Sequence, residues 1–278
     1  MLVRSWINLA CLTAVLALGA WLWLAPREAP PREYRLSSLE SSQVDRIRVA
    51  RVGLLPIELQ RKGERWRITA PITARAAPIK VSQMLELLAA RSRERLEAER
   101  LERYDLAPPP LTVTLGSQSF GFGMVNPVTH QQYVLVGDAV YLIPPRYAAA
   151  FPLTVDDVLT RNLLAPDERP VAIELPHVRA TLRDGRWHVE PASDGISQDD
   201  VNRWLDRWRH AIAAATEVVD GNTQAGERAA IRLADGRTVE LTIERREPEL
   251  TLVRRDEGLR FRFPAEVGRR MLARPDSS

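Results

Sequence analysis

The residues that could do chemistry are few and widely spaced. The histidines are His130, His177, His188 and His210, and the single cysteine is Cys11. This spacing contains no HExxH motif or other close ligand pair, and one cysteine forms neither an intramolecular disulfide nor a cysteine-based zinc site. We therefore expect no metal and no cofactor.

Two pairs of adjacent acids are the remaining candidates for catalysis. The pairs at residues 156–157 and 199–200 follow Thr154 and Ser197, either of which can cap a helix. Carboxylates in a first helical turn complement the helix dipole, so we interpret both pairs as helix starts. GxSxG and SxxK nucleophile motifs are absent from the sequence, and the glycines of residues 116–123 lack the GK[ST] ending of a phosphate loop. The sequence predicts a protein that is not an enzyme.

The composition indicates a globular chain with almost balanced charge. Of its 278 residues, 45% are hydrophobic and 27% are charged, and 39 basic residues face 36 acidic ones. Nucleic-acid binding needs an excess of positive charge, which a net charge of +3 does not supply. In the arginine-rich segment at residues 91–103 the charges nearly cancel, which is typical of a solvated surface. No nucleic-acid partner is expected.

An uncharged N-terminal segment predicts a membrane anchor. Trp6 to Ala25 is a run of 20 residues without a charge, which as a helix spans about the 30 Å of a bilayer core. Trp6, Trp21 and Trp23 lie where interfacial aromatic residues are found. A cleaved signal peptide is the alternative, but a small-x-small cleavage site is not evident. A short N-terminal tail before a long polar body favours a single-pass anchor with the body outside the cytoplasm.

The remainder of the chain shows signs of internal duplication. Trp66 and Trp187 each follow a glycine turn and precede a proline, and they lie 121 residues apart. The apolar stretches at 111–115 and 229–233 lie 118 residues apart. We therefore expect an anchor at 1–25, a Pro-rich spacer at 26–39, a first repeat at 40–165 and a second repeat at 166–278. Recurrence of generic hairpins by chance is the alternative.

Hydrophobic periodicity predicts both strands and helices in each repeat. Alternating residues at 44–49, 55–61 and 66–69 are typical of half-buried antiparallel strands. A helix is expected from about Ile79 to Arg91, and a second helix is expected to begin at Ser197. The apolar stripe of the second helix, which we expect to be core, comprises Val201, Trp204, Leu205, Trp208 and Ile212. The predicted fold class is α+β: an N-terminal transmembrane helix followed by two tandem, internally duplicated small α+β units with antiparallel sheets.

One loop is a candidate for contact with a partner. It lies between two β segments, contains a proline and carries polar groups, and its residues are Asn126, Pro127, Val128, Thr129 and His130. A purely structural turn is the alternative interpretation.

The first repeat resembles the bacterial membrane-protein family called domain of unknown function 4340. The resemblance rests on an ordered set of landmarks: Trp66, Pro71, the helix from Ile79, the turn Tyr104-Asp105-Leu106-Ala107-Pro108-Pro109, the strand at Val113 and the hairpin ending at Ile143. Asp105 stands where the family pattern has glycine, and Ala107 where it has aspartate. The resemblance implies an anchored component of the bacterial inner membrane with its body in the periplasm. Some such proteins are associated with ABC-type transport systems, and the resemblance implies no catalytic residues.

Three functions are consistent with these features. The first is a membrane-anchored extracytoplasmic accessory protein that contacts the bilayer through Trp6 to Ala25 and binds a membrane-protein or transporter partner. The second is a periplasmic module that binds envelope polymers in a cleft between the repeats. Its exposed aromatic residues would be Tyr104, Tyr133, Tyr141 and Phe120. A hydrolase with unassigned acids is the third.

Overall fold

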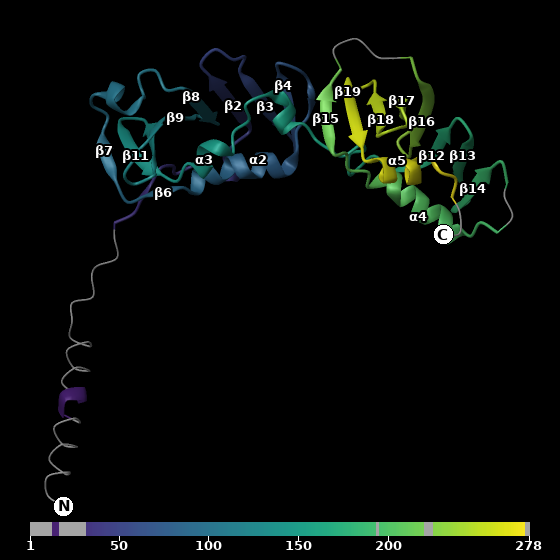
Figure 1. Cartoon of the computed structure of the whole chain (residues 1–278), viewed down its shortest axis with the longest axis horizontal. Helices are drawn as coiled ribbons and strands as arrows, with labels where there is room; N and C mark the ends of the chain where they lie inside the picture. The colour runs from purple at the N-terminus through teal and green to yellow at the C-terminus, as the bar shows by residue number, and fades with distance from the viewer. Residues whose placement is uncertain (1–12, 17–31, 193–194, 220–224, 276–278) are drawn as a thin grey trace, which may run out of the picture.

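The computed structural model describes residues 13–16, 32–192, 195–219 and 225–275. Two large antiparallel sheets contain most of this chain, and the helices are few and short (Figure 1). The expected α+β class is therefore wrong in the share of helix that it predicts, because the described chain is mostly β. One reason is that the first predicted helix is shorter than expected: α2 (Pro78–Leu85) gives way to the 3-10 helix η2 (Glu86–Ala89) and then to a strand.

The first sheet has the strand order β5-β4-β3-β2-β8-β9-β10-β11-β7. Its strands, from one edge to the other, are β5 (Ala74–Arg75), β4 (Arg65–Ala70), β3 (Ile57–Lys62), β2 (Arg46–Arg51), β8 (Leu111–Leu115), β9 (Gln118–Val125), β10 (Gln132–Val136), β11 (Ala139–Ile143) and β7 (Arg95–Glu97). A separate short pair joins β1 (Tyr34–Arg35) to β6 (Arg91–Ser92). Alternate residues of β2 and β3 face the core, as the predicted alternation requires.

The second sheet follows the strand order of the first, except that edge strand β5 has no counterpart in it. Its strands are β14 (Arg186–Glu190), β13 (Val178–Arg183), β12 (Pro170–Leu175), β16 (Glu227–Leu233), β17 (Thr238–Arg245), β18 (Leu250–Arg254), β19 (Leu259–Phe263) and β15 (Ala215–Val218). In each sheet three strands joined by hairpins come before a helix: β2, β3 and β4 before α2, and β12, β13 and β14 before α4 (Gln198–Arg209). After the helix, a short strand forms the far edge of the sheet, where β7 pairs with β11 and β15 pairs with β19. Eight strands of the first sheet thus have a counterpart at the same place in the second.

Short helices pack on one face of each sheet. Below the first sheet lie α2 and α3 (Arg146–Ala149), and below the second lie α4 (Gln198–Arg209) and α5 (Ala265–Leu272) (Figure 1). Trp204 and Trp208 are almost fully buried, and both indole Nε1 atoms donate to the Met271 carbonyl, at 3.1 and 2.9 Å. The prediction that this stripe is core is confirmed except at Ile212, which lies beyond the helix and is 63% exposed.

The two acid pairs lie at helix starts, as predicted. Asp200 accepts hydrogen bonds from the Ser197 hydroxyl and backbone N–H, and the Ser197 hydroxyl in turn accepts from the Asp200 N–H. The hydrogen bond from the Ser197 hydroxyl is the main reason why the pKa of Asp200 is lowered. Asp157 accepts from the Thr154 N–H at the start of the 3-10 helix η4 (Val155–Val158).

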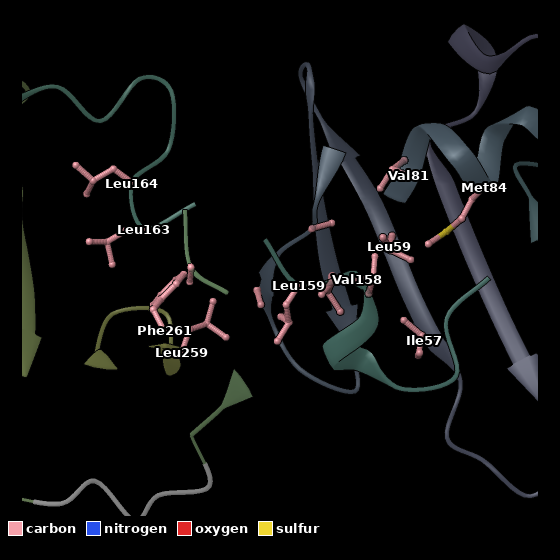
Figure 2. Packing of buried hydrophobic residues seen from close by; sticks show 14 of the residues in the cluster. Ile57, Leu59, Val81, Met84, Val158, Leu159, Leu163, Leu164, Leu259 and Phe261 are labelled. Carbon is pink, nitrogen blue, oxygen red and sulfur yellow. The ribbon is translucent and has the colours of Figure 1, made fainter. Parts of the chain in front are cut away.

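The segment that joins the two sheets is buried between them. Val158, Leu159, Leu163 and Leu164 are buried members of a hydrophobic cluster that includes residues of both sheets (Figure 2). Arg254 is 1% exposed, and its guanidinium donates to both carboxylate oxygens of Glu168 at 2.6 and 2.7 Å. The cleft that the ligand-binding hypothesis expects between the repeats is therefore occupied at this junction by paired charges and apolar side chains.

Most of the predicted anchor and spacer lies outside the described residues. Of Trp6 to Ala25, the structure describes residues 13–16, which are helical. Among the described residues no helix combines the length and the hydropathy needed to cross a membrane. The spacer is described from residue 32, and Cys11 lies outside the described residues.

Candidate interaction surface

The candidate loop lies at one end of the first sheet, together with other connections. The register pairs Arg51 with Leu111, Leu111 with Phe122, and Gln132 with both Val125 and Ile143. The loop between β2 and β3, the chain entering β8, the loop between β9 and β10 and the chain leaving β11 therefore all meet at this end. The predicted Asn126 to His130 loop is one of these four connections.

Large exposed apolar side chains concentrate at this end. Residues 32–275, as far as they are described, contain ten exposed large hydrophobic residues, and seven belong to these connections or the strand end beside them. We call these seven the apolar rim: Val52, Leu54, Leu55, Met124, Val125, Val128 and Leu153. Leu55 is 76% exposed and Val128 is 84% exposed, so both side chains are available for contact. Clusters of this kind mark interaction surfaces more often than scattered single residues do.

Six of the seven rim residues lie in two stretches of the chain without charged residues. Residues 106–137 form a stretch of 32 residues without Asp, Glu, Lys or Arg, although 27% of the whole chain is charged. Residues 52–57 also lack charged side chains. These two segments therefore supply no Lys or Arg side chain that could attract phosphate groups.

The Asn126 side chain shapes the tip of the candidate loop. Its Oδ1 accepts from the N–H groups of Val128 and Thr129 at 2.8 and 3.1 Å, and its Nδ2 donates to the Tyr133 hydroxyl at 2.7 Å. His130 has a φ of 55°, and its N–H donates to the Asn126 carbonyl. The loop is thus an ordered turn, as the structural alternative requires. The same turn holds Val128 outward, so the two interpretations of this loop are compatible.

Interactions behind the rim fix the other connections. The Arg51 guanidinium donates to the carbonyls of Phe151 and Pro152, which places Leu153 beside the end of β2. Phe151 packs on Phe122 with ring centroids 5.8 Å apart. Burial lowers the pKa of Arg51, an effect that the charge of Asp157 partly offsets. The rim therefore rests on a packed base.

The equivalent end of the second sheet is polar. There the loop between β12 and β13 is Pro176-His177, and the loop between β17 and β18 contains Arg246, Glu247 and Glu249. Arg246 pairs with Glu227 through two hydrogen bonds of 3.0 and 2.9 Å. At this end the described residues include no exposed large hydrophobic side chain. Two sheets with the same strand order differ here, so the fold itself does not require an apolar rim.

The aromatic residues proposed for ligand stacking are largely used in packing. Phe120 and Tyr141 are buried. Tyr104 lies against Tyr133, with ring centroids 4.5 Å apart. Within the described part of the chain, no group of three or more His, Cys, Asp or Glu side chains stands close enough to hold a metal ion.

Sequence reasoning missed the larger part of the rim. Leu55 was expected at the start of a strand, but β3 begins at Ile57 and leaves Leu55 in the loop. The available signal was the run Val52-Gly53-Leu54-Leu55, which does not alternate and ends at a proline. Only strand pairing brings this run to the same end as Val128 and Leu153.

Comparison with known proteins gives one match. The model of a family described as "Domain of unknown function (DUF4340)" matches residues 66–235. This range begins in β4 of the first sheet and extends beyond β16 of the second, so it includes the buried junction. No curated protein and no solved structure matches the chain.

Proposed function

The chain belongs to the family described as domain of unknown function (DUF4340), and from this membership and the apolar rim we propose a membrane-anchored, extracytoplasmic interaction protein without catalysis. The observation that carries the proposal is the concentration of exposed apolar side chains at one end of the first sheet, six of them in two stretches without charged residues. The matching strand orders support a body made of two tandem copies of one unit.

The uncharged run from Trp6 to Ala25 supports the anchor in the bacterial inner membrane. In this arrangement the spacer that begins at residue 26 joins the anchor to a body in the periplasm, and the end of the predicted spacer, with β1 (Tyr34–Arg35) and the buried Leu36, packs on that body. The resemblance to anchored family members supports the same location.

The partner that the rim fits is a protein with an apolar, uncharged surface. A membrane protein such as a transporter subunit has this chemistry, and association with an ABC-type transport system agrees with what the family resemblance implies. An apolar centre with few charges is typical of the buried part of protein interfaces.

The test is capture of the partner from native membranes. Tagged full-length protein is purified in mild detergent, and proteins retained in stoichiometric amount are identified by mass spectrometry. The rim variant combines Leu54→Ser, Leu55→Ser and Val128→Ser. The matched control combines Ile79→Ser, Leu182→Ser and Ile212→Ser, which removes the three exposed large hydrophobic residues of 32–275 that lie outside the rim.

We expect the control variant to retain a membrane-protein partner that the rim variant loses. Equal retention by both variants contradicts the assignment of the rim as the contact surface. Recovery of the unaltered protein alone contradicts a stable partner. Equal unfolding temperatures of the two variants establish that any difference in capture comes from the surface and not from the fold.

A further inference from the structure

A small cavity lies on the face of the second sheet that the helices leave uncovered. Its volume is about 250 Å³, and residues of β15, β17, β18 and β19 line it together with Glu249. Leu250 and Leu252 of β18 point to the core and Leu250 contacts α5, so Thr251 between them points to the opposite face. The cavity is therefore formed by the outer side of the sheet.

A row of hydrogen-bond donors crosses three strands in this cavity. Thr251 of β18 is the direct register partner of Arg245 on β17 and of Arg262 on β19. A bulge in β17 between Ile243 and Arg245 brings both Glu244 and Arg245 to the cavity, although adjacent strand residues ordinarily face opposite sides. Bulges often redirect side chains beside binding sites.

Two buried donor atoms in this row, one on Thr251 and one on Arg262, have no acceptor within the described structure. Thr251 is 5% exposed, and its buried hydroxyl has no hydrogen-bond partner. The buried Nε of Arg262 also has none. Arg245 is exposed and forms no ion pair among the described residues. A buried donor without an acceptor is costly, so its persistence at a cavity wall points to an acceptor supplied from outside the chain.

The acids beside the row restrict the charge of such a ligand. Glu217 accepts from Arg262 at 2.5 Å, while Glu249 lies 3.8 Å from Arg262. Glu244 pairs with Arg260. The lining thus combines three carboxylates with three guanidinium groups. A multiply charged anion would be repelled by the acids, whereas a ligand with one carboxylate and one ammonium group complements both kinds of side chain.

Among the described residues, the equivalent place in the first sheet has different side chains and no row of unpaired donors. The strand positions that correspond to Thr251 and Arg262 are Tyr133 and Leu142, which are register partners in β10 and β11. The Tyr133 hydroxyl accepts from Asn126, and its ring lies against Tyr104. A sheet with this strand order can therefore form without a row of unpaired hydrogen-bond donors.

We propose that the cavity binds a small zwitterion of amino-acid size. The carboxylate of the ligand accepts from Thr251, Arg245 and Arg262 Nε, and its ammonium group faces Glu249 and Glu217. The volume is below the range of about 300–1,000 Å³ typical of sites for larger ligands, which limits the ligand to a few heavy atoms beyond these groups. This binding activity goes beyond the proposed interaction function and does not depend on it.

The experiment uses full-length protein in detergent and isothermal titration calorimetry. The probes are glycine, L-alanine and L-serine as zwitterions, with acetate, methylammonium and inorganic phosphate as singly functional or anionic comparisons. The binding variants are Thr251→Val and Arg245→Gln. The matched control is Thr216→Val, because Thr216 is also buried with an unpartnered hydroxyl but does not line the cavity.

We expect at least one zwitterion to bind the unaltered protein and the Thr216→Val variant equally. Affinity falls by about tenfold or more in Thr251→Val and Arg245→Gln, as expected for loss of a hydrogen bond or ion pair to a charged ligand. Thr251→Val removes an unpartnered hydroxyl, so its unfolding temperature stays at or above that of the unaltered protein. The proposal is overturned if no zwitterion binds, if phosphate binds as tightly, or if the binding variants keep full affinity.

Discussion

Arg75 and Glu257 lie 182 residues apart in the sequence and form two hydrogen bonds, of 2.6 and 2.9 Å, between the two sheets. Arg75 belongs to edge strand β5, and Glu257 lies in the turn between β18 and β19. The same guanidinium donates to the carbonyls of Asn162 and Leu163 in the connecting segment. One side chain therefore joins the first sheet, the connection and the second sheet.

Replacing Arg75 by Gln is expected to weaken this junction. It would leave the carboxylate of Glu257, whose side chain is 8% exposed, with Arg254 at 3.8 Å as its remaining cationic partner. Loss of one member of a buried ion pair lowers the free energy of unfolding by about 3 kcal/mol. Urea denaturation measures the change. Arg228→Gln, in the exposed pair with Glu240, is the control and should cost less than about 1 kcal/mol. An equal decrease in the free energy of unfolding in both variants would show that the Arg75–Glu257 pair stabilises the fold no more than an exposed pair does.

Glu168 is expected to make the junction sensitive to acid. Burial raises the pKa of Glu168, but hydrogen bonds from Arg254 and the Ala165 N–H outweigh burial and lower the pKa overall. A carboxyl group with a lowered pKa in the folded state stabilises the fold above its unfolded pKa of about 4.3, and this stabilisation is lost as the pH falls toward the folded value. Denaturation midpoints between pH 7 and pH 3 measure the loss. Glu168→Gln should have lower stability at pH 7 and a smaller fall on acidification; an unchanged pH profile would contradict this assignment.

Asn126 is expected to stabilise the tip of the candidate loop without contributing to the rim surface. Asn126→Ala removes three hydrogen bonds, two from backbone N–H groups and one to Tyr133. The free energy of local opening should fall by about 1–2 kcal/mol. Hydrogen exchange of residues 126–132 should accelerate while exchange in β2 and β8 stays constant. The control is Thr129→Ala, whose exposed hydroxyl has no bond within the described structure; faster exchange of equal size in that variant would refute the role of Asn126.

Trp208 is expected to hold α5 against α4. Its side chain is fully buried, and its indole N–H donates to the Met271 carbonyl at 2.9 Å. Trp208→Phe removes this bond and part of the packing volume, which should lower the free energy of unfolding by about 1–3 kcal/mol. Denaturation followed by circular dichroism measures the change. Trp187→Phe is the comparison, since Trp187 is half-buried, and a cost as large as that of Trp208→Phe would contradict the prediction.

Local sequence patterns were sufficient to predict much of the fold. Alternation predicted the half-buried strands around Val49 and Leu59, and helical spacing predicted the buried stripe at Trp204 and Trp208. The cap at Ser197 and Asp200 was predictable because its hydrogen bonds join residues three apart. The order of landmarks also indicated the family that the family model matches. The short edge strands β7 and β15 were not predicted, because their partners are distant in the sequence.

The sequence by itself determined the local elements, the near balance of charge and the uncharged stretch at 106–137, since these depend on residue type and short spacing. Only the tertiary structure decided which loops share an end of a sheet and which donors form a row. Val52 and Val128 come to the same end of the first sheet, and Arg245 and Arg262 come to either side of Thr251, through the register of antiparallel strands rather than through spacing along the chain. A shift of one residue in that register would turn each of these side chains to the other face. Both proposed surfaces therefore depend on long-range pairing.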